Sequence, residues 1–263
     1  MKIKTVIAIL LLMPFANAKA DMFDVKNIPE KEKFSLKFTY KGIDLAHPNP
    51  KPFNQRFMAA EAKLSVVIET YFVGDGAERH LESVITGIAQ NGYTEKQYFK
   101  FKPDTKLILS YIERNIFTSS GKKILTESYD LSTHVPPWPK DMIHPSALPL
   151  ALRGFDFVPN KVRSFYLWFN PVTVFSMRIT LKGEEEIAVP AGTFQCYRME
   201  MDPDLVDFGG PILGRVLKPV VAKYLLWLDK KPPYRIVKYQ GPFGQINIAS
   251  GPTESYELSK IGE

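Results

Sequence analysis

The chain has very little of the material from which covalent and metal-bound frameworks are built. Its 263 residues include one cysteine, Cys196, and four histidines. A single thiol excludes an intramolecular disulfide framework and any metal site made of several cysteines. The sequence also lacks the motifs G-x-S-x-G, H-E-x-x-H and C-x-x-C, so it carries no common hydrolase, zinc-protease or redox signature. We therefore expect no metal and no cofactor.

The chain also lacks a strong excess of charge of one sign, because it has 34 basic and 28 acidic residues. Hydrophobic residues make up 45% of the sequence. That composition is typical of a globular protein and excludes wholesale disorder. The lysines at positions 31, 33, 37 and 41 make one strand face basic, while the aromatic residues between them point to the opposite face. Such a strand is not an interleaved platform for bases, and we expect no nucleic-acid partner.

The N-terminus carries the pattern of a secretory signal peptide. Lys2 and Lys4 precede an apolar run from Val6 to Phe15, and two overlapping A-x-A cleavage sites follow within residues 16–20. The run is too short to span a bilayer, and no later segment has the roughly eighteen apolar residues that a span requires. We predict a signal peptide at 1–20 and a single exported β domain at 21–263, periplasmic and not membrane-spanning after cleavage.

Short segments of alternating apolar and polar residues dominate the rest of the chain. This period of two indicates strands with one buried face, and the turns between them favour an antiparallel sheet over βαβ units. The predicted fold is mainly β, with one or two short helices and long Pro/Gly loops. The expected strands are 34–41, 64–72, 107–117, 124–131, 175–182, 196–201, 224–229, 235–240, 245–249 and 255–258, with a hairpin turn at 119–122.

Two segments carry helical signals. Asp75 to Glu78 has the spacing of a capping box, and four apolar residues between 81 and 88 fall on one helical face. The run from His80 to Ile85 also fits alternation, so a strand is the alternative there. The second helix is expected from Ser146 to Arg153, with Pro145 in its first turn and Gly154 after its end.

Aromatic residues are abundant, with 18 Phe, 12 Tyr and 3 Trp. The segments 165–169 and 224–228 are bulky and apolar on both strand faces, and such strands have to be covered twice. The second cover is either a helix or loop of the protein or a bound apolar ligand. The candidate residues lining a ligand cavity are Trp168, Tyr224, Trp227 and Tyr239, with a long Gly/Pro loop at 202–218 as a lid.

The remaining candidates have ordinary structural interpretations. Glu184 to Glu186 is most simply a charged, solvated strand edge, and Cys196 is a small apolar filler on a strand. An enzymatic role requires that folding place His134 or His144 beside an aspartate or glutamate.

The residues V-P-A-G-T-F at 189–194 form a plausible turn, with Pro190 fixing φ and Gly192 accepting a positive φ. Together with the segment YLLWLDKKPPYRIVKYQG at 224–241, where Lys230 to Pro233 is a turn and Tyr234 begins the return strand, this turn resembles an uncharacterised family of exported bacterial proteins. That family is similar to periplasmic lipoprotein carriers, in which a curved half-barrel sheet wraps a hydrophobic cavity. The resemblance implies an open, curved sheet and favours strand over helix at 75–92. It brings no catalytic residues.

The leading hypothesis is thus a periplasmic, non-enzymatic protein that binds a lipid or other hydrophobic envelope component in the concave face of its sheet. The alternative is an accessory or scaffold protein of a cell-envelope assembly, acting through contacts with envelope proteins. An enzyme with a histidine–carboxylate pair is the third possibility.

Overall fold

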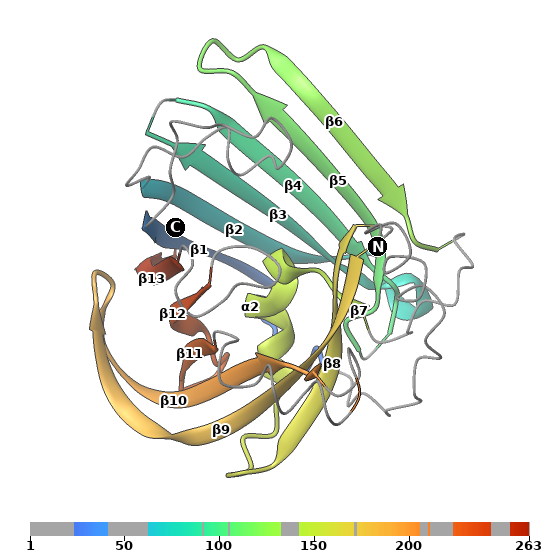
Figure 1. The fold of residues 1–263 in the computed structure, drawn as a ribbon. Helices are drawn as coiled ribbons and strands as arrows, with labels where there is room; N and C mark the ends of the chain where they lie inside the picture. The colour runs from blue at the N-terminus through green and yellow to red at the C-terminus, as the bar shows by residue number, and fades with distance from the viewer. Residues whose placement is uncertain are drawn as a thin grey trace, which may run out of the picture.

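The computed structural model describes residues 24–41, 63–90, 92–104, 106–132, 142–170, 173–205, 210, 223–242 and 253–262. They form one 13-stranded sheet that curves around a short helix and does not close (Figure 1). The predicted fold class is therefore confirmed. The predicted strand 245–249 and most of the predicted loop at 202–218 lie outside the described residues.

The sheet consists of two wings that differ in their place along the chain. The N-terminal wing contains β1 (Lys31–Lys41), β2 (Lys63–Val73), β3 (His80–Ala89), β4 (Thr94–Phe101), β5 (Leu109–Phe117) and β6 (Lys123–Asp130). The C-terminal wing contains β7 (Met142–Ile143), β8 (Val162–Asn170), β9 (Thr173–Val189), β10 (Gly192–Pro203), β11 (Tyr224–Asp229), β12 (Ile236–Pro242) and β13 (Thr253–Ile261).

Neighbouring strands of each wing follow one another along the chain, and the two wings meet where β1 pairs antiparallel with β13. The free edges of the sheet are consequently β6 and β7, which are consecutive in sequence. All pairings are antiparallel except that of β7 with β8. The chain therefore passes from one edge of the sheet to the other between residues 130 and 142.

The segment 75–92 is a strand, and the helical interpretation is wrong. Gly76–Glu78 forms a single 3-10 turn, and Asp75 makes no capping bond through its side chain. From His80 to Ala89 every second residue is buried, with Leu81 and Ile85 inward. The strands β2 and β4 form hydrogen bonds with the backbone of β3 on both sides. These bonds stabilise the strand over a helix, although the apolar residues of this segment also fit one helical face.

The predicted helix at 146–153 is confirmed and lies inside the curve of the sheet (Figure 1). It consists of η3 (Pro145–Ala147), α2 (Leu148–Ala151) and η4 (Leu152–Gly154). Leu150 and Leu152 are fully buried, and each such leucine contributes about 1.5–3 kcal/mol by leaving water. This helix fills part of the concave space and packs on the inner faces of the strands.

Of three turn and edge features predicted from the sequence, two agree with the structure and one is wrong. Pro190 and Ala191 form the turn between β9 and β10, and Gly192 has a φ of 132°. The pairing of β8 ends at Thr180, so the stretch from Glu184 to Glu186 lies where β9 has only β10 beside it, as predicted for a charged edge. Tyr234 does not begin the return strand: it lies in the turn with a φ of 55°, and β12 begins at Ile236.

Gly154, at the end of this inner helix, lies directly against the backbone of the N-terminal segment. A Cβ atom at Gly154 would lie 2.3 Å from the backbone nitrogen and 2.4 Å from the backbone oxygen of Asp24. Backbone atoms cannot turn aside as a flexible side chain does. Asn27 Nδ2 also donates to the Arg153 carbonyl oxygen at 2.6 Å, so the two segments are held together beside this glycine.

The substitution Gly154→Ala is expected to lower the free energy of unfolding by about 1–3 kcal/mol, because overpacking forces backbone shifts. Urea denaturation measures this loss. Gly183→Ala is the matched control, since its Cβ would meet nothing within 4 Å and a change within about 0.5 kcal/mol is expected there. Equal losses at both glycines would contradict the close approach to Asp24.

Candidate functional site

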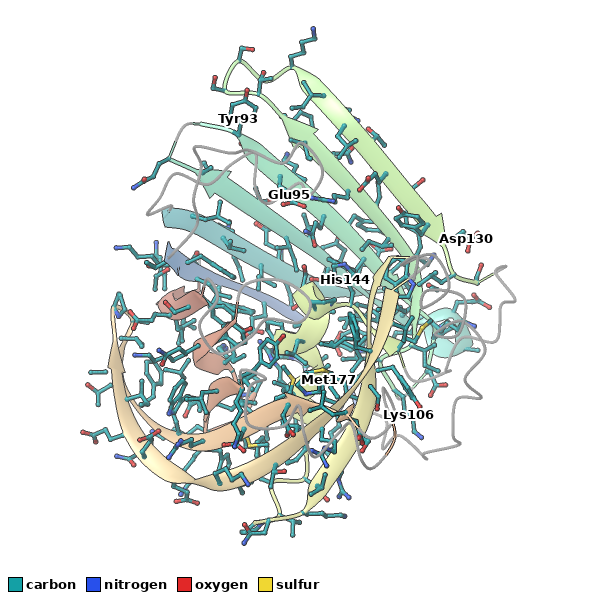
Figure 2. The ribbon with its side chains drawn as sticks, viewed as in Figure 1. Tyr93, Glu95, Lys106, Asp130, His144 and Met177 are labelled. Carbon is teal, nitrogen blue, oxygen red and sulfur yellow. The ribbon has the colours of Figure 1, made fainter. Side chains whose placement is uncertain are left out.

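Four polar side chains gather on the inner face of the N-terminal wing, and we call Glu95, Gln97, Arg114 and Glu127 the inner polar cluster. They come from β4, β5 and β6, where Gln97 lies opposite Arg114 and Arg114 opposite Glu127. Across β3 the same rung continues to the buried Ile85, which fixes the cluster on the core side of the sheet. Figure 2 shows Glu95 on this wing and His144 near α2.

The inner polar cluster is connected through Glu95 and Arg114. Arg114 Nε donates to Glu95 Oε1 at 2.6 Å and its Nη1 donates to Glu127 Oε2 at 3.0 Å. Gln97 Nε2 donates to the same Glu95 oxygen at 2.8 Å. The guanidinium thus holds both carboxylates, and the three charged groups together carry one net negative charge when both acids are ionised.

The charged members of the cluster keep limited contact with solvent. The exposed fractions of the side chains are 19% for Glu95, 22% for Arg114 and 37% for Glu127. Desolvation nevertheless raises the pKa of Glu95, against the opposing effects of Arg114 and the Gln97 hydrogen bond. Glu95 is therefore partly open to solvent and still desolvated on the inner side of the wing.

An aromatic wall adjoins the cluster, made of Phe99, Tyr129, His144 and Trp168. The Trp168 ring lies 5.4 Å from Tyr129 and 5.9 Å from His144, and His144 lies 5.2 Å from Phe99, all between ring centroids. Arg114 acts electrostatically on both His144 and Tyr129. The wall and the inner polar cluster are therefore parts of one region.

His144 is a structural histidine held in its neutral form. Its Nδ1 accepts a hydrogen bond from the Ser146 backbone N–H at 3.2 Å and so caps η3. Burial and then the charge of Arg114 lower the pKa of His144 to about 3. The charged group that acts on this imidazole is a guanidinium rather than a carboxylate, so it is not set up as a general base. His134, the other candidate, lies outside the described residues.

Two polar atoms of this region are buried and have no hydrogen-bond partner, the indole nitrogen Nε1 of Trp168 and the amide oxygen Oε1 of Gln97. Trp168 is 1% exposed. Buried polar groups are nearly always bonded, and each exception needs a reason. One of these atoms is a donor and the other is an acceptor.

The four predicted cavity residues occupy different places. Tyr224 and Tyr239 lie 6.1 Å apart in a row of inner aromatic rings that continues through Tyr256 to Phe38. Trp168 belongs to the aromatic wall described above. Trp227 faces away from its inward neighbour Leu226: its Nε1 donates to Glu185, and Lys238 lies 5.9 Å from its ring. The structure thus brings the two tyrosines together and neither tryptophan with them.

Sequence reasoning missed the inner polar cluster. The usable signal is the acidic and polar pair Glu95 and Gln97 at the inward positions of β4, just before the buried Phe99. Inward charges near a sheet edge are one way in which sheets avoid edge-to-edge pairing, so such a pattern alone does not identify a site.

Cys196 fits its predicted role as an apolar filler. The thiol is fully buried, and burial, with Asp229 and Glu185 next, raises its pKa to about 12. No group of three or more His, Cys, Asp or Glu side chains suited to a metal occurs among the described residues. Within the same residues, none of the helices has the length and hydropathy needed to cross a membrane.

Comparison with known proteins gives similarities of structure alone. No protein-family model matches the sequence, and no curated protein matches it. A β-barrel-like protein of the DUF1849 family from Brucella abortus has 10% identity and a TM-score of 0.44, with 88% of this chain and 97% of that one covered.

Two further solved structures are similar over the same extent. A protein from Bacteroides fragilis described as exported, with a YmcC-like fold, has 9% identity and a TM-score of 0.37, with 92% of this chain and all of that one covered. A protein from Parabacteroides distasonis described as a lipoprotein has 10% identity and a TM-score of 0.35, over the same shares. Likenesses with TM-scores this low carry no argument about function.

Proposed function

We propose that this chain is a non-enzymatic, periplasmic protein that binds an amphiphilic envelope component, a lipid or similar molecule, in the concave face of its sheet. The observation that carries the proposal is the composition of one inner rung of the N-terminal wing. Leu36, Val66 and Gly87, all three buried, lie in register on β1, β2 and β3, and the partly exposed Glu95 of the inner polar cluster comes next.

An amphiphile matches such a surface because its chain and its head have different requirements. Burial of the apolar part lowers the free energy of binding by about 25 cal/mol per Å² of apolar surface removed from water. This gain needs no catalytic group. The polar part needs hydrogen-bonding groups at the end of the apolar path. The ordering of the ligand reduces the net gain. Export through the predicted signal peptide is part of the same proposal.

The strands that are apolar on both faces do not need a bound ligand to bury their second face. Phe165 and Trp168 lie on opposite faces of β8 and both are buried, with Trp168 covered by Tyr129 and His144. The proposal therefore rests on the N-terminal wing and no longer on the apolar residues of β8 and β11.

The scaffold alternative requires an exposed apolar docking patch. The large apolar side chains exposed among the described residues come from several separate elements, namely Val73, Ile88, Ile124, Val158, Val162 and Ile261. Single exposed residues of this kind are ordinary on soluble proteins, so the alternative gains no support. Crosslinking in intact cells would detect a stable envelope partner.

Native mass spectrometry and solvent extraction of the mature protein, purified without detergent, test the carrier proposal. We expect a co-purifying amphiphile, and we expect Gly87→Leu to reduce its yield by about tenfold by filling the path, at roughly 1.4 kcal/mol per tenfold change. The atoms nearest to a Cβ at Gly87 belong to the Leu64 side chain, at 3.6 Å or more. Ile88→Leu, the next residue and 47% exposed, is the matched control.

Absence of any amphiphile from the unmodified protein would contradict the proposal. So would equal yields from the Gly87→Leu and Ile88→Leu proteins, provided that both have the circular dichroism spectrum of the parent.

A further inference from the structure

The inner polar cluster also contains information about the polar end of the ligand. We propose that the ligand ends in an uncharged head with hydroxyl or amide groups, which both donates and accepts hydrogen bonds, and that this head binds between Trp168 and Gln97. This inference rests on the proposed function, because it specifies the ligand of that same concave face.

The charge balance of the cluster disfavours an anionic head. Arg114 already donates to Glu95 and Glu127, at 2.6 and 3.0 Å. A phosphate or carboxylate bound here would lie near two carboxylates. The one guanidinium of the cluster is already paired with both of them. Adding an anion to a partly buried site with net negative charge is unfavourable, because like charges repel and water screens them little.

The unmade hydrogen bonds point to a neutral head with two functions. The Trp168 Nε1–H can only donate, and the Gln97 Oε1 atom can only accept. Both are buried and unpartnered, and buried groups without partners cost free energy that a suitable ligand recovers. A hydroxyl group accepts from the indole and donates to the amide oxygen, which a fully ionised head cannot do.

The two atoms belong to one region of the structure. Gln97 lies directly opposite Arg114 on the neighbouring strand, and Arg114 acts on His144 and Tyr129. These are the two rings that contact Trp168. Gln97 and Phe99 are also successive inward residues of β4. Phe99 contacts His144, which contacts Trp168. The proposed head binds between Gln97 and Trp168.

Amphiphiles with the same unsaturated eighteen-carbon type of chain and different heads separate the possibilities. The probes are monooleoylglycerol with a neutral diol head, oleate with a carboxylate, and oleyl phosphate with a phosphate and no other hydroxyl group on its chain, each titrated calorimetrically into delipidated mature protein. We expect monooleoylglycerol to bind about tenfold or more tightly than either anion, since two buried hydrogen bonds are recovered only with the diol.

Two substitutions test the named atoms. Trp168→Phe removes the indole N–H and keeps an aromatic ring, and Gln97→Met removes the amide oxygen and keeps the chain length. Each is expected to weaken monooleoylglycerol by about fivefold to tenfold and to leave oleate unchanged. Trp227→Phe is the matched control, because that indole donates to Glu185 on the other face of the sheet and no change is expected.

The outcomes separate the two proposals. Binding without head preference, tighter binding of an anion, or equal affinities in Trp168→Phe, Gln97→Met and Trp227→Phe would overturn the head-group inference and leave the carrier proposal standing. Failure of all three amphiphiles to bind would overturn both. If Trp168→Phe does not fold, Gln97→Met and the comparison of heads on the parent protein decide the matter.

Discussion

Replacing Glu32 with glutamine is expected to lower the free energy of unfolding by about 3–5 kcal/mol, because the change leaves buried cations without their counter-charge. Glu32 is 7% exposed on the inner face of β1. It accepts from Arg153 Nη1 of η4 and from Arg235 Nε, one bond on each carboxylate oxygen. Arg153 is fully buried, so water cannot replace the lost partner.

Equilibrium urea denaturation of the mature protein measures this loss. Glu69→Gln is the matched control, since Glu69 pairs with Lys33 at 3.1 Å and both side chains are more than 40% exposed. An exposed pair of this kind is worth about 0–1 kcal/mol. A triple variant, Glu32→Leu with Arg153→Met and Arg235→Met, is expected to recover much of the loss, because apolar side chains replace the whole ionic group and no guanidinium is left without its carboxylate.

Similar losses for Glu32→Gln and Glu69→Gln would show that Glu32 is not buried between the two guanidinium groups.

The ion pairs of Glu32 also help to fix the position of the inner helix. Glu32 ties the end of the inner helix to β1, while His144 caps the start of that helix. The extent to which the helix fills the concave face is therefore fixed at both of its ends.

Lowering the pH from 7 to 4 is expected to cost about 3 kcal/mol of stability through His144 alone. The pKa of His144 is lowered to about 3 in the folded protein from an ordinary value of 6.5. Between these two values the unfolded chain binds a proton that the folded chain does not. The stability contributed by the neutral imidazole is present above the unfolded pKa and is lost as the pH falls.

His144→Asn tests this titration and keeps an acceptor at the cap of η3, because asparagine is a good N-cap residue. The difference in stability between pH 7 and pH 4 is expected to shrink by about 3 kcal/mol in this variant. Phe34→Leu, which changes a buried ring on β1 that lies near Arg153 at the other end of the inner helix, is the control, and its cost should be the same at both pH values.

Glu95 acts in the opposite direction, since its raised pKa favours the folded state as the pH falls. Its effect is common to the parent and to His144→Asn and cancels when the two are compared. The same pH dependence in both proteins would contradict a buried neutral His144.

Local pattern was sufficient for most strands of this fold. The alternation at 34–41 and 64–72 predicted β1 and β2 because one face of each packs into the same core, at Phe34 and Leu36 on β1 and at Val66 and Ile68 on β2. At 75–92 the apolar residues fit a helix and a strand equally well, and only the flanking strands decide between them. The place of the helix inside the sheet also depends on distant partners, as the pairing of Arg153 with Glu32 across 121 residues shows.

The candidate site was predicted less well for the same reason. Aromatic character identified Trp168 and Trp227 as lining residues, yet alternation sends neighbouring residues to opposite faces, and nothing local says which face of β11 is the concave one. Arg114 and Glu127 come from different strands and become partners only through the register of β5 and β6. A single sequence contains no information on that register beyond the hairpin turn.

The seam between β1 and β13 sets an order on assembly. A chain made from its N-terminus forms the six strands of the first wing early, but β1 then has β2 on one side and an open edge on the other until the nine residues of β13 arrive. Open edges recruit other strands. The middle of the finished sheet is consequently the last part to close, and β1 keeps an unpaired edge until β13 reaches it.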